Sequence, residues 1–315
     1  MKTVVLTLIS LVILSISVQA NENRSFPKVK HMIDTHIHLY DTSRDGGVPW
    51  PPEEDTVLHK PHLPKEFQNE SKKSGLTGVI IVEASHLLKD NKWVLKLVNG
   101  NDFFVGLVGN VNPYRKDFVT QIESLKKDSR FVGVRARNGG KQKKIDFSNP
   151  DIIKNFNYLS KNGLSLDILT NGGGVEAVKK IDKLAKKIPN LHIIANHVIG
   201  YDFDGKTVDP EWTKAVESLA KNKNVWCKIS GLYQRSVEQP APKDLSQYNE
   251  ALDILWKNLG EDRLIYGSNW PCTKHSGNYK SYVTLVNQYF SAKGQQACEK
   301  YFWKNASKAY RLNLK

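Results

Sequence analysis

Short, apolar, β-branched runs alternate with longer amphipathic stretches along almost the whole chain. Eight such runs can be delimited: Met32–His38, Gly78–Glu83, Phe103–Gly109, Phe131–Arg135, Leu164–Leu169, Leu191–His197, Val225–Ser230 and Leu264–Asn269. Most are nearly continuous in apolar residues, as the strands of a parallel sheet buried on both faces require. The alternation therefore predicts an α/β fold in which helices cover a parallel sheet.

The stretches that separate these runs carry helix periodicity and helix start signals. Asn149-Pro150 and Asp209-Pro210 each place a capping residue before a proline at the first helical position. Helices are expected over Asp117–Lys127, Pro150–Lys161, Gly174–Lys187, Pro210–Lys223, Asp244–Leu259, Tyr279–Phe290 and Gln295–Trp303. Eight strands with intervening and closing helices predict a single-domain (β/α)8 TIM barrel.

An open, doubly wound sheet is the alternative architecture. Such a sheet usually announces itself by a glycine-rich phosphate turn after its first strand. The chain has Asp34-Thr-His-Ile-His38 at that point instead, which favours the barrel.

The first residues have the pattern of a secretory signal peptide. Lys2 gives a positive start, Val4 to Val18 is mostly apolar, and Val18-Gln19-Ala20 offers small side chains for cleavage. The apolar run is too short to span a bilayer comfortably. We expect residues 1–20 to be removed, no membrane association afterwards, and residues 21–315 to form the barrel of an exported protein, periplasmic or secreted.

The number and distribution of charged residues limit the classes of partner that we expect the chain to bind. The formal net charge is +14, but lysine pairs such as Lys72-Lys73 and Lys186-Lys187 are scattered over successive helices. A nucleic-acid binder would gather them on one face with interleaved aromatic residues. We therefore expect a small-molecule substrate and no nucleic acid. Attraction of anionic ligands and assembly into a homo-oligomer are left open.

Three cysteines, Cys227, Cys272 and Cys298, have none of the spacings typical of metal knuckles or redox motifs. An odd number permits one disulfide at most. Cys272 has no paired base at a defined spacing, so we expect it to be a bystander thiol rather than a nucleophile.

The first predicted strand carries the strongest chemical signal. Asp34, His36 and His38 are two residues apart, so on a regular strand they share one face. Two imidazoles and a carboxylate inside a barrel are unfavourable unless they are partnered. A pair of inward histidines at the carboxyl end of a strand therefore indicates a catalytic or metal site more than a structural role.

His197 ends the sixth predicted strand. The ends of strands one and six face the same mouth of a barrel, so this ring could meet His36 and His38. A helix cap or a core histidine is the alternative interpretation of His197.

Several other polar residues end predicted strands. Glu83 ends the second, and Arg135 and Arg137 share a face at the end of the fourth. Glu83 could face the substrate in the mouth, and the two guanidinium groups could bind a carboxylate or hydroxyl-rich substrate. A structural ion pair is the alternative for each of the three residues. Lys228 lies within the seventh strand and needs a partner if it is buried, but its face is not fixed by the sequence.

Aromatic residues are candidates for contact with a sugar ring. Trp50, Tyr233 and Trp270 lie near predicted strand ends or in the irregular segment Asp41–Leu63. Stacking on a sugar and ordinary packing are both open for them. The segment Asp41–Leu63 is predicted to lie over the mouth as a lid or a substrate wall.

Five motifs in chain order complete the pattern. They are His36-x-His38, Phe131-Val-Gly-Val-Arg135, Asn196-His197, Trp226-Cys-Lys-Ile-Ser-Gly231 and Asp262-Arg-Leu-Ile-Tyr-Gly-Ser-Asn-Trp-Pro271. Together they resemble the amidohydrolase-related family (amidohydrolase 2), and within it the branch of sugar lactonases and pyrone-dicarboxylate lactonase. The resemblance extends from about Ile33 to Leu312.

This resemblance implies a hydrolase that opens a small, sugar-acid type lactone. The histidines matching the family pattern are His36, His38 and His197, which would polarise the carbonyl directly or as ligands of a divalent metal such as zinc. Metal-independent catalysis is left open. The family places an aspartate, acting as base, where this chain has Asn269.

An amide neither accepts a proton well nor supplies an anionic ligand, so Asn269 changes the expected chemistry. Glu83, Asp34 or His197 could replace the missing base, or a metal-bound hydroxide could act without one. Two further functions remain open: metal-dependent decarboxylation, as in relatives of the same superfamily, and ligand binding without turnover.

Overall fold

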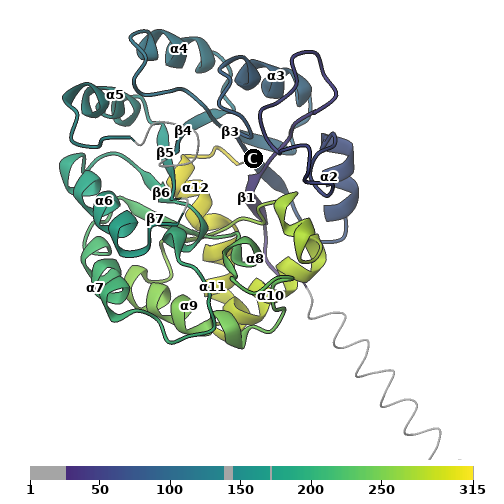
Figure 1. Ribbon diagram of the computed structural model, residues 1–315, viewed down its shortest axis with the longest axis vertical. Helices are drawn as coiled ribbons and strands as arrows, with labels where there is room; N and C mark the ends of the chain where they lie inside the picture. The colour runs from purple at the N-terminus through teal and green to yellow at the C-terminus, as the bar shows by residue number, and fades with distance from the viewer. Residues whose placement is uncertain (1–25, 138–144, 171, 315) are drawn as a thin grey trace, which may run out of the picture.

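The computed structural model describes residues 26–137, 145–170 and 172–314. Eight parallel strands form one sheet in which each strand pairs with the next along the chain, and the helices lie in a ring around them (Figure 1). The strands are β1 (Ile33–Ile37), β2 (Gly78–Val82), β3 (Phe104–Gly109), β4 (Phe131–Arg137), β5 (Ser165–Leu169), β6 (Ile193–Ala195), β7 (Val225–Ile229) and β8 (Leu264–Tyr266).

The sheet returns to β1 through the residues that follow β8. Trp270 bridges Ile37 in parallel, and its carbonyl accepts from the His38 amide at 2.8 Å. The Asn269 amide donates to the His36 carbonyl, also at 2.8 Å. The predicted (β/α)8 barrel is therefore confirmed. The hydrogen bonds that close it are made by the backbone of His36 and His38.

The helices follow the strands in the expected alternation. They are α2 (Pro64–Ser71), α3 (Lys89–Leu97), α4 (Phe118–Leu125), α5 (Pro150–Lys161), α6 (Gly174–Lys187), α7 (Pro210–Leu219), α8 (Leu232–Arg235), α9 (Ser246–Leu259), α10 (Tyr279–Ala292), α11 (Gln295–Glu299) and α12 (Asn305–Tyr310). Asn149 and Asp209 accept from backbone amides of α5 and α7, as their capping signals predicted.

Several element boundaries differ from the sequence prediction by a few residues, and two of the differences are informative. The sixth strand ends at Ala195 instead of His197, because a tight turn, η1 (His197–Gly200), begins there. The last helix does not stop at Trp303, since the π-helical turn η3 (Lys300–Lys304) leads directly into α12.

Two apolar clusters form the core. One lies inside the barrel and includes Ile33, Ile80, Ile194 and Ile265, and α12 contributes Tyr310 to it. A much larger apolar cluster lies between the sheet and the helices, where α-helical faces bury residues such as Phe156, Trp212 and Phe290. The polar side chains of the site occupy the carboxyl-terminal part of the barrel.

Three further predictions concern the first twenty residues, membrane-spanning helices and the cysteines. The expected signal peptide, residues 1–20, lies outside the described residues. Among the helices of the described ranges, none has the length and apolarity to cross a membrane. All three cysteines are buried and unpaired, so the one disulfide that the sequence allowed does not form.

Gly133 in β4 tests the close packing of the barrel wall. A Cβ at this position would lie 2.8 Å from the Ser165 carbonyl oxygen, which is backbone and cannot swing away. Gly133→Ala should lower the free energy of unfolding by about 1–3 kcal/mol, because the added atom forces strands β4 and β5 apart. Urea unfolding monitored by circular dichroism measures this. Val119→Ala at an exposed helix position should stay within about 0.5 kcal/mol of the parent.

Candidate active site

Three imidazoles lie together at the carboxyl-terminal end of the barrel. The His36 ring centroid is 5.0 Å from that of His38 and 4.4 Å from that of His197. All three side chains are buried, His36 completely. The structure thus brings the β1 motif and the residue after β6 into one cluster, as the sequence predicted.

The pairing of β1 with β2 is irregular between Asp34 and Ile37, and this break decides where Asp34 lies. The Asp34 carboxylate accepts from the His36 amide at 3.0 Å, the Ser268 amide at 2.9 Å and the Tyr279 hydroxyl of α10 at 3.1 Å. Burial raises its pKa. The prediction that Asp34 shares the face of the histidines is therefore wrong: the strand irregularity directs it toward α10, so Asp34 is no base for the site.

His197 is presented by an unusual turn. His197, Val198 and Ile199 have φ of 49°, 49° and 59°, a left-handed conformation that is unfavourable for β-branched residues. Such strain persists only where the surrounding structure enforces it. The ring bonds the Ser230 hydroxyl at 2.9 Å, and Gly231 leaves room for it, since a Cβ there would lie 2.7 Å from Nδ1.

Glu83, Arg135 and Arg137 form a buried ionic cluster beside the histidines. Arg135 Nε donates to Glu83 Oε1 at 2.6 Å, and Arg137 forms two bonds of 2.7 Å to the same carboxylate. Both oxygens of Glu83 are therefore occupied. In this structure Glu83 is a partner of the arginines, and its assignment as a substrate-binding residue or as the base stays a prediction. Among the described residues, Glu83 is the one carboxylate paired with these two guanidinium groups, so the cluster carries a net positive charge.

Hydrogen bonds fix which ring nitrogen carries the proton. His38 Nδ1 lies 2.9 Å from the Val82 carbonyl, which only accepts, so Nδ1 is the donor and Nε2 keeps its lone pair. Arg135 Nη1 lies 3.5 Å from His36 Nε2, and because a guanidinium only donates, this Nε2 is also an acceptor. His36 Nδ1 then carries a proton with no partner among the described residues.

All three histidines are held neutral. Burial lowers the pKa of His36, His38 and His197 well below the ordinary imidazole value, and nearby positive charges lower it further. For His38 the largest of these charges is Arg135. Neutral rings at pH 7 are available to accept protons.

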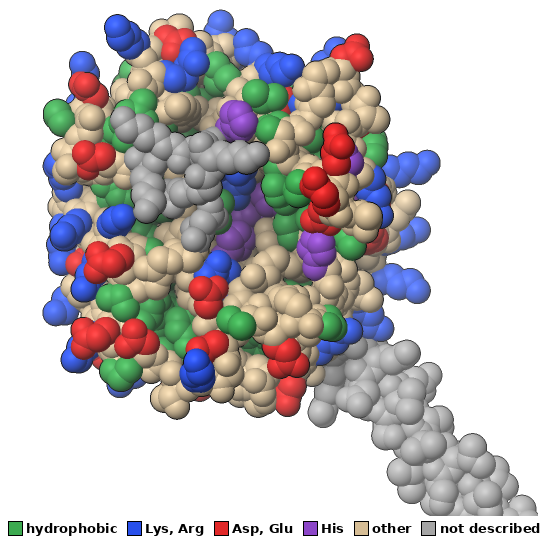
Figure 2. Space-filling model, viewed as in Figure 1, with side chains coloured by type: hydrophobic (Ala, Val, Ile, Leu, Met, Phe, Trp, Pro, Cys, Tyr) green, Lys and Arg blue, Asp and Glu red, His purple; other side chains and the backbone are tan. Residues whose placement is uncertain are grey.

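The cluster opens into a cavity of about 320 Å³ at the carboxyl ends of the strands. Its wall includes His38, His197, Arg135, Arg137, Trp50 and Asn269. Figure 2 shows histidine side chains in the hollow at the centre of this face, with Lys or Arg side chains beside them. Trp50 comes from the segment after β1, so that segment does form a wall of the cavity as expected.

The remaining two aromatic candidates lie elsewhere. Tyr233 is fully buried and its hydroxyl reaches Ser281 on α10. Trp270 packs against Phe67 of α2 and its indole donates to Glu70 at 2.9 Å. Neither is among the residues that line the cavity, and both pack against surrounding helices, so their assignment as substrate-binding residues stays a prediction without support from the cavity wall.

Sequence reasoning missed several residues of the cavity wall. Thr170, Gln234 and Arg235 line it, and Gln234 accepts from the Asn269 amide at 3.1 Å. They follow strands β5 and β7, and only their position after a strand end could have indicated them. Cys272 also lines the cavity, but burial raises its pKa to about 12, so it is a protonated thiol, in agreement with its prediction as a bystander.

The sequence did not fix which way the Lys228 side chain points, and the structure does. The side chain is completely buried inside the barrel and forms an ion pair of 2.7 Å with Asp167 of β5. Asp167 was not among the predicted residues. The signal that could have found it is a lone carboxylate in an otherwise apolar strand of a chain that also places a lysine in another.

A larger cavity of about 890 Å³ lies at the opposite end, around the starts of β1 and β3. Its wall includes His31, Ile33 and Phe104, and His31 is its one histidine. The histidine cluster and the arginines are all at the other end of the barrel, which makes the smaller cavity the candidate active site.

A divalent metal does not fit the histidine cluster in this arrangement. In the described part of the chain, no three His, Cys, Asp or Glu side chains are disposed to hold a metal ion. More telling is the charge: His36 Nε2 faces the Arg135 guanidinium, and the Glu83 carboxylate is committed to two arginines. A cation bound to His36 Nε2 would have to displace Arg135.

The barrel and its polar mouth define an enzyme-like α/β barrel with a histidine and arginine site. The model of the amidohydrolase family matches residues 33–312, so this chain belongs to the amidohydrolase family, as its motifs predicted.

Two relatives of similar length are lactonases. The L-fucono-1,5-lactonase of Burkholderia ambifaria is 25% identical over 286 residues, 89% of this chain and 96% of its own length. The L-rhamnono-gamma-lactonase of Scheffersomyces stipitis is 22% identical, over 89% of this chain and 98% of its own length. The prediction of a lactonase-like hydrolase of the amidohydrolase superfamily is confirmed at this level.

A solved structure shares the fold. An amidohydrolase from Burkholderia multivorans, with bound zinc, aligns with a TM-score of 0.79 at 19% identity, over 90% of this chain and 100% of its own. At this identity the likeness concerns the fold.

The buried histidines predict an acid-sensitive fold. Their pKa is near 6.5 in the unfolded chain and lower in the folded protein, so the unfolded state binds more protons below that pH. Stability should be constant above about pH 7 and fall below about pH 6.5, by about 1.4 kcal/mol per pH unit for each histidine that stays neutral.

Urea unfolding between pH 5 and pH 8 measures this dependence. A free energy of unfolding that stays flat down to pH 5 would show that the three rings protonate freely in the folded protein.

Proposed function

We propose that this protein hydrolyses a small sugar-acid lactone in the cavity bounded by His38, His197 and Arg135. The observation that carries the proposal is a neutral imidazole with a fixed acceptor nitrogen, His38 Nε2, in the same cavity wall as a buried guanidinium. Ester hydrolysis needs this combination, because a water must lose a proton while a carbonyl oxygen gains negative charge. The two lactonase relatives support the same reaction class.

His38 is the proposed general base. Its Nδ1 is held by the Val82 carbonyl, which orients the ring and leaves Nε2 to take a proton from water. The water oxygen then bonds to the lactone carbonyl carbon. When the ring C–O bond breaks, the leaving alkoxide takes that proton back from His38, and the product is the open hydroxy acid.

Arg135 is the proposed stabiliser of the intermediate. Glu83 neutralises only one of the two arginine charges. The negative charge of the tetrahedral oxyanion would balance the positive charge that remains. Buried charge interacts with the oxyanion more strongly than a solvated one would. His197, tethered to Ser230, lies in the same wall and is placed to hydrogen-bond the carbonyl or the ring oxygen.

The cavity suits a compact, hydroxyl-rich ring. About 320 Å³ accommodates a monosaccharide lactone, and its wall offers Thr170, Gln234 and Asn269 as hydrogen-bonding groups. Trp50 supplies an aromatic surface on which a sugar ring can lie. An aldonolactone matches both the size and the polarity.

We propose that this chemistry proceeds without a metal, since the positive charge of Arg135 occupies the place beside His36 Nε2. The zinc in the Burkholderia multivorans structure keeps a divalent cofactor as the alternative, with His36, His38 and His197 as its ligands. Metal-dependent decarboxylation depends on that alternative. Export through a signal peptide at residues 1–20 also remains a proposal.

Replacing His38 tests the base directly. His38→Gln should lower kcat on aldonolactones by about 10²–10⁴, because the water loses its proton acceptor, with a small change in KM. Proton release from a panel of gamma- and delta-aldonolactones measures the rates. His31→Gln, near the amino-terminal ends of the strands, is the matched control and should retain parental activity. Full activity of His38→Gln would remove His38 from the mechanism.

Asn269→Asp tests the metal question. The backbone there has φ of 59°, which aspartate tolerates as asparagine does, so the fold should persist. An anionic oxygen at the mouth should raise the zinc content of the purified protein, measured by mass spectrometry, at least several-fold over the parent. The parent should keep its lactonase activity in chelator. Loss of parental activity in EDTA with recovery on adding zinc would overturn the metal-free proposal.

A further inference from the structure

Inside the barrel, below the catalytic cluster, Lys228 is completely buried and makes two directed hydrogen bonds. Its ammonium group donates to Asp167 Oδ2 at 2.7 Å and to the Thr35 carbonyl at 2.8 Å. Burial lowers its pKa, and the adjacent Asp167 opposes this. Burying a charge costs free energy unless the charge is paired and hydrogen-bonded, as it is here.

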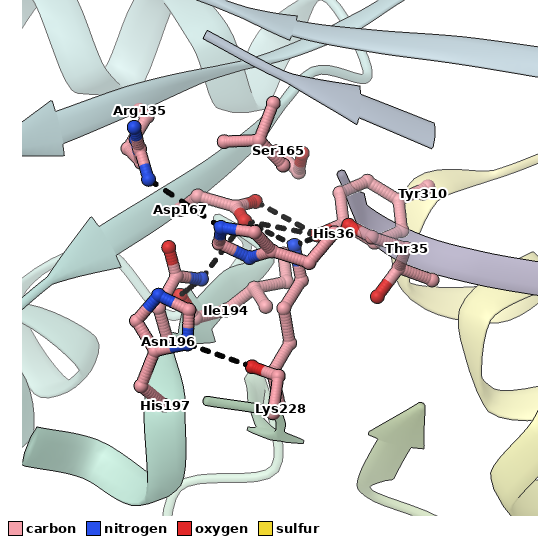
Figure 3. A network of polar contacts seen from close by, with 12 residues as sticks. Thr35, His36, Arg135, Ser165, Asp167, Ile194, Asn196, His197, Lys228 and Tyr310 are labelled. Carbon is pink, nitrogen blue, oxygen red and sulfur yellow. Dashed lines mark hydrogen bonds and ion pairs between the residues drawn. The ribbon is translucent and has the colours of Figure 1, made fainter. Parts of the chain in front are cut away.

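Asp167 is the other half of the pair and gathers several elements. Besides Lys228, it accepts from the Asn196 amide at 2.9 Å and from the Tyr310 hydroxyl at 2.9 Å. Figure 3 shows these groups converging on its carboxylate next to His36. Strands β5 and β7, the end of β6 and helix α12 therefore meet at one point.

The two backbone segments held by this pair are those that carry the histidines. Thr35 directly precedes His36, and it lies where the pairing of β1 with β2 is broken. Asn196 directly precedes His197 and the turn with left-handed φ. Lys228 thus holds the segment before His36 through the Thr35 carbonyl, and Asp167 holds the segment before His197 through the Asn196 side chain.

We propose that the Lys228–Asp167 pair positions the catalytic histidines, fixing the β1 motif and His197 relative to each other. Neither residue lines the cavity, so both act through the backbone and not on the substrate. The inference rests on the proposed function for its kinetic part. Its geometric part concerns the rings alone.

The test must separate positioning from stability. Removing one partner leaves the other charge buried without a counter-ion, which destabilises the fold. Replacing both partners by apolar residues of similar size often leaves stability unchanged. The informative variant is therefore the double substitution Lys228→Met/Asp167→Leu. It removes the charge without exposing a partner, and it also removes the bonds to Thr35 and Asn196.

A matched control lies at the start of β4. Arg130 pairs with Asp128 and donates to the backbone carbonyls of Val98 and Leu95 at 2.9 and 3.0 Å. It combines an ion pair with anchoring of backbone, as Lys228 does, far from the histidines. Arg130→Met/Asp128→Leu should leave kcat unchanged within about twofold.

For the Lys228→Met/Asp167→Leu protein we expect a cooperative thermal transition, kcat on aldonolactones lower by about 100-fold, and KM within about threefold of the parent. Misplacing reacting groups by about 1 Å costs a rate factor of this size. KM stays because Arg135 and Arg137 on β4 are untouched. A kcat within threefold of the parent in the folded variant would overturn the proposal.

Histidine NMR gives a readout that does not depend on turnover. In protein labelled with ¹⁵N-histidine, the ring resonances of His36, His38 and His197 should shift in the double variant and stay in place in the control. If the parent hydrolyses no lactone, the proposed function fails, yet these shifts still decide the positioning proposal. Unshifted rings would overturn it.

A milder change covers the case in which the double variant does not fold. Asn196→Ser removes the bond to Asp167 from the His197 segment only. The His197 ring resonance should then shift while that of His38 stays in place. An unmoved His197 resonance in this variant would contradict the proposal.

Discussion

Two arginines share one buried carboxylate at the mouth of the barrel, and the chemistry of the site depends on that imbalance. Glu83 uses both oxygens to hold Arg135 and Arg137, which leaves one positive charge in a desolvated environment. Burial lowers the pKa of the adjacent imidazoles, and this charge lowers the pKa of His38 and His197 further, so the rings are neutral at pH 7. The charge also opposes a cation at His36 and favours an anionic intermediate. The same charge therefore bears on the protonation of the rings and on the metal-free reaction proposed for the site.

The barrel supports this arrangement through departures from regular structure. β1 breaks its register between Asp34 and Ile37, which sends Asp34 toward α10 while His36 joins the cluster. Three left-handed residues after β6 turn His197 into the mouth. Both irregularities adjoin the Lys228–Asp167 pair inside the barrel. Strain and buried charge are concentrated where precision of placement matters for catalysis.

Much of the fold was readable from local pattern, because strand and helix periodicity and caps such as Asn149 and Asp209 are properties of short segments. The histidine cluster was also predictable, since barrel topology brings the ends of β1 and β6 to one mouth. The direction of Asp34 was not, because it depends on the irregular pairing of β1 with β2 and on contacts with Tyr279 and Ser268, which local pattern does not reveal.

The roles of single polar and aromatic residues were the least predictable part. Whether Glu83 faces substrate or two arginines depends on side chains from β4, over fifty positions away in the chain. Tyr233 and Trp270 follow strand ends, as cavity residues do, yet they pack against α10 and α2. Asp167 was overlooked because its partner Lys228 lies on a different strand.

A crystal structure of the protein with the open-chain aldonate product in the cavity would show whether Arg135 and the histidines bind the reacting group without a metal. We expect the product carboxylate within hydrogen-bonding distance of Arg135 and His197, with His38 Nε2 facing the carboxyl carbon and the Glu83 cluster intact. A product bound with its carboxylate on a metal ion held by His36, His38 and His197, and Arg135 displaced, would contradict this expectation.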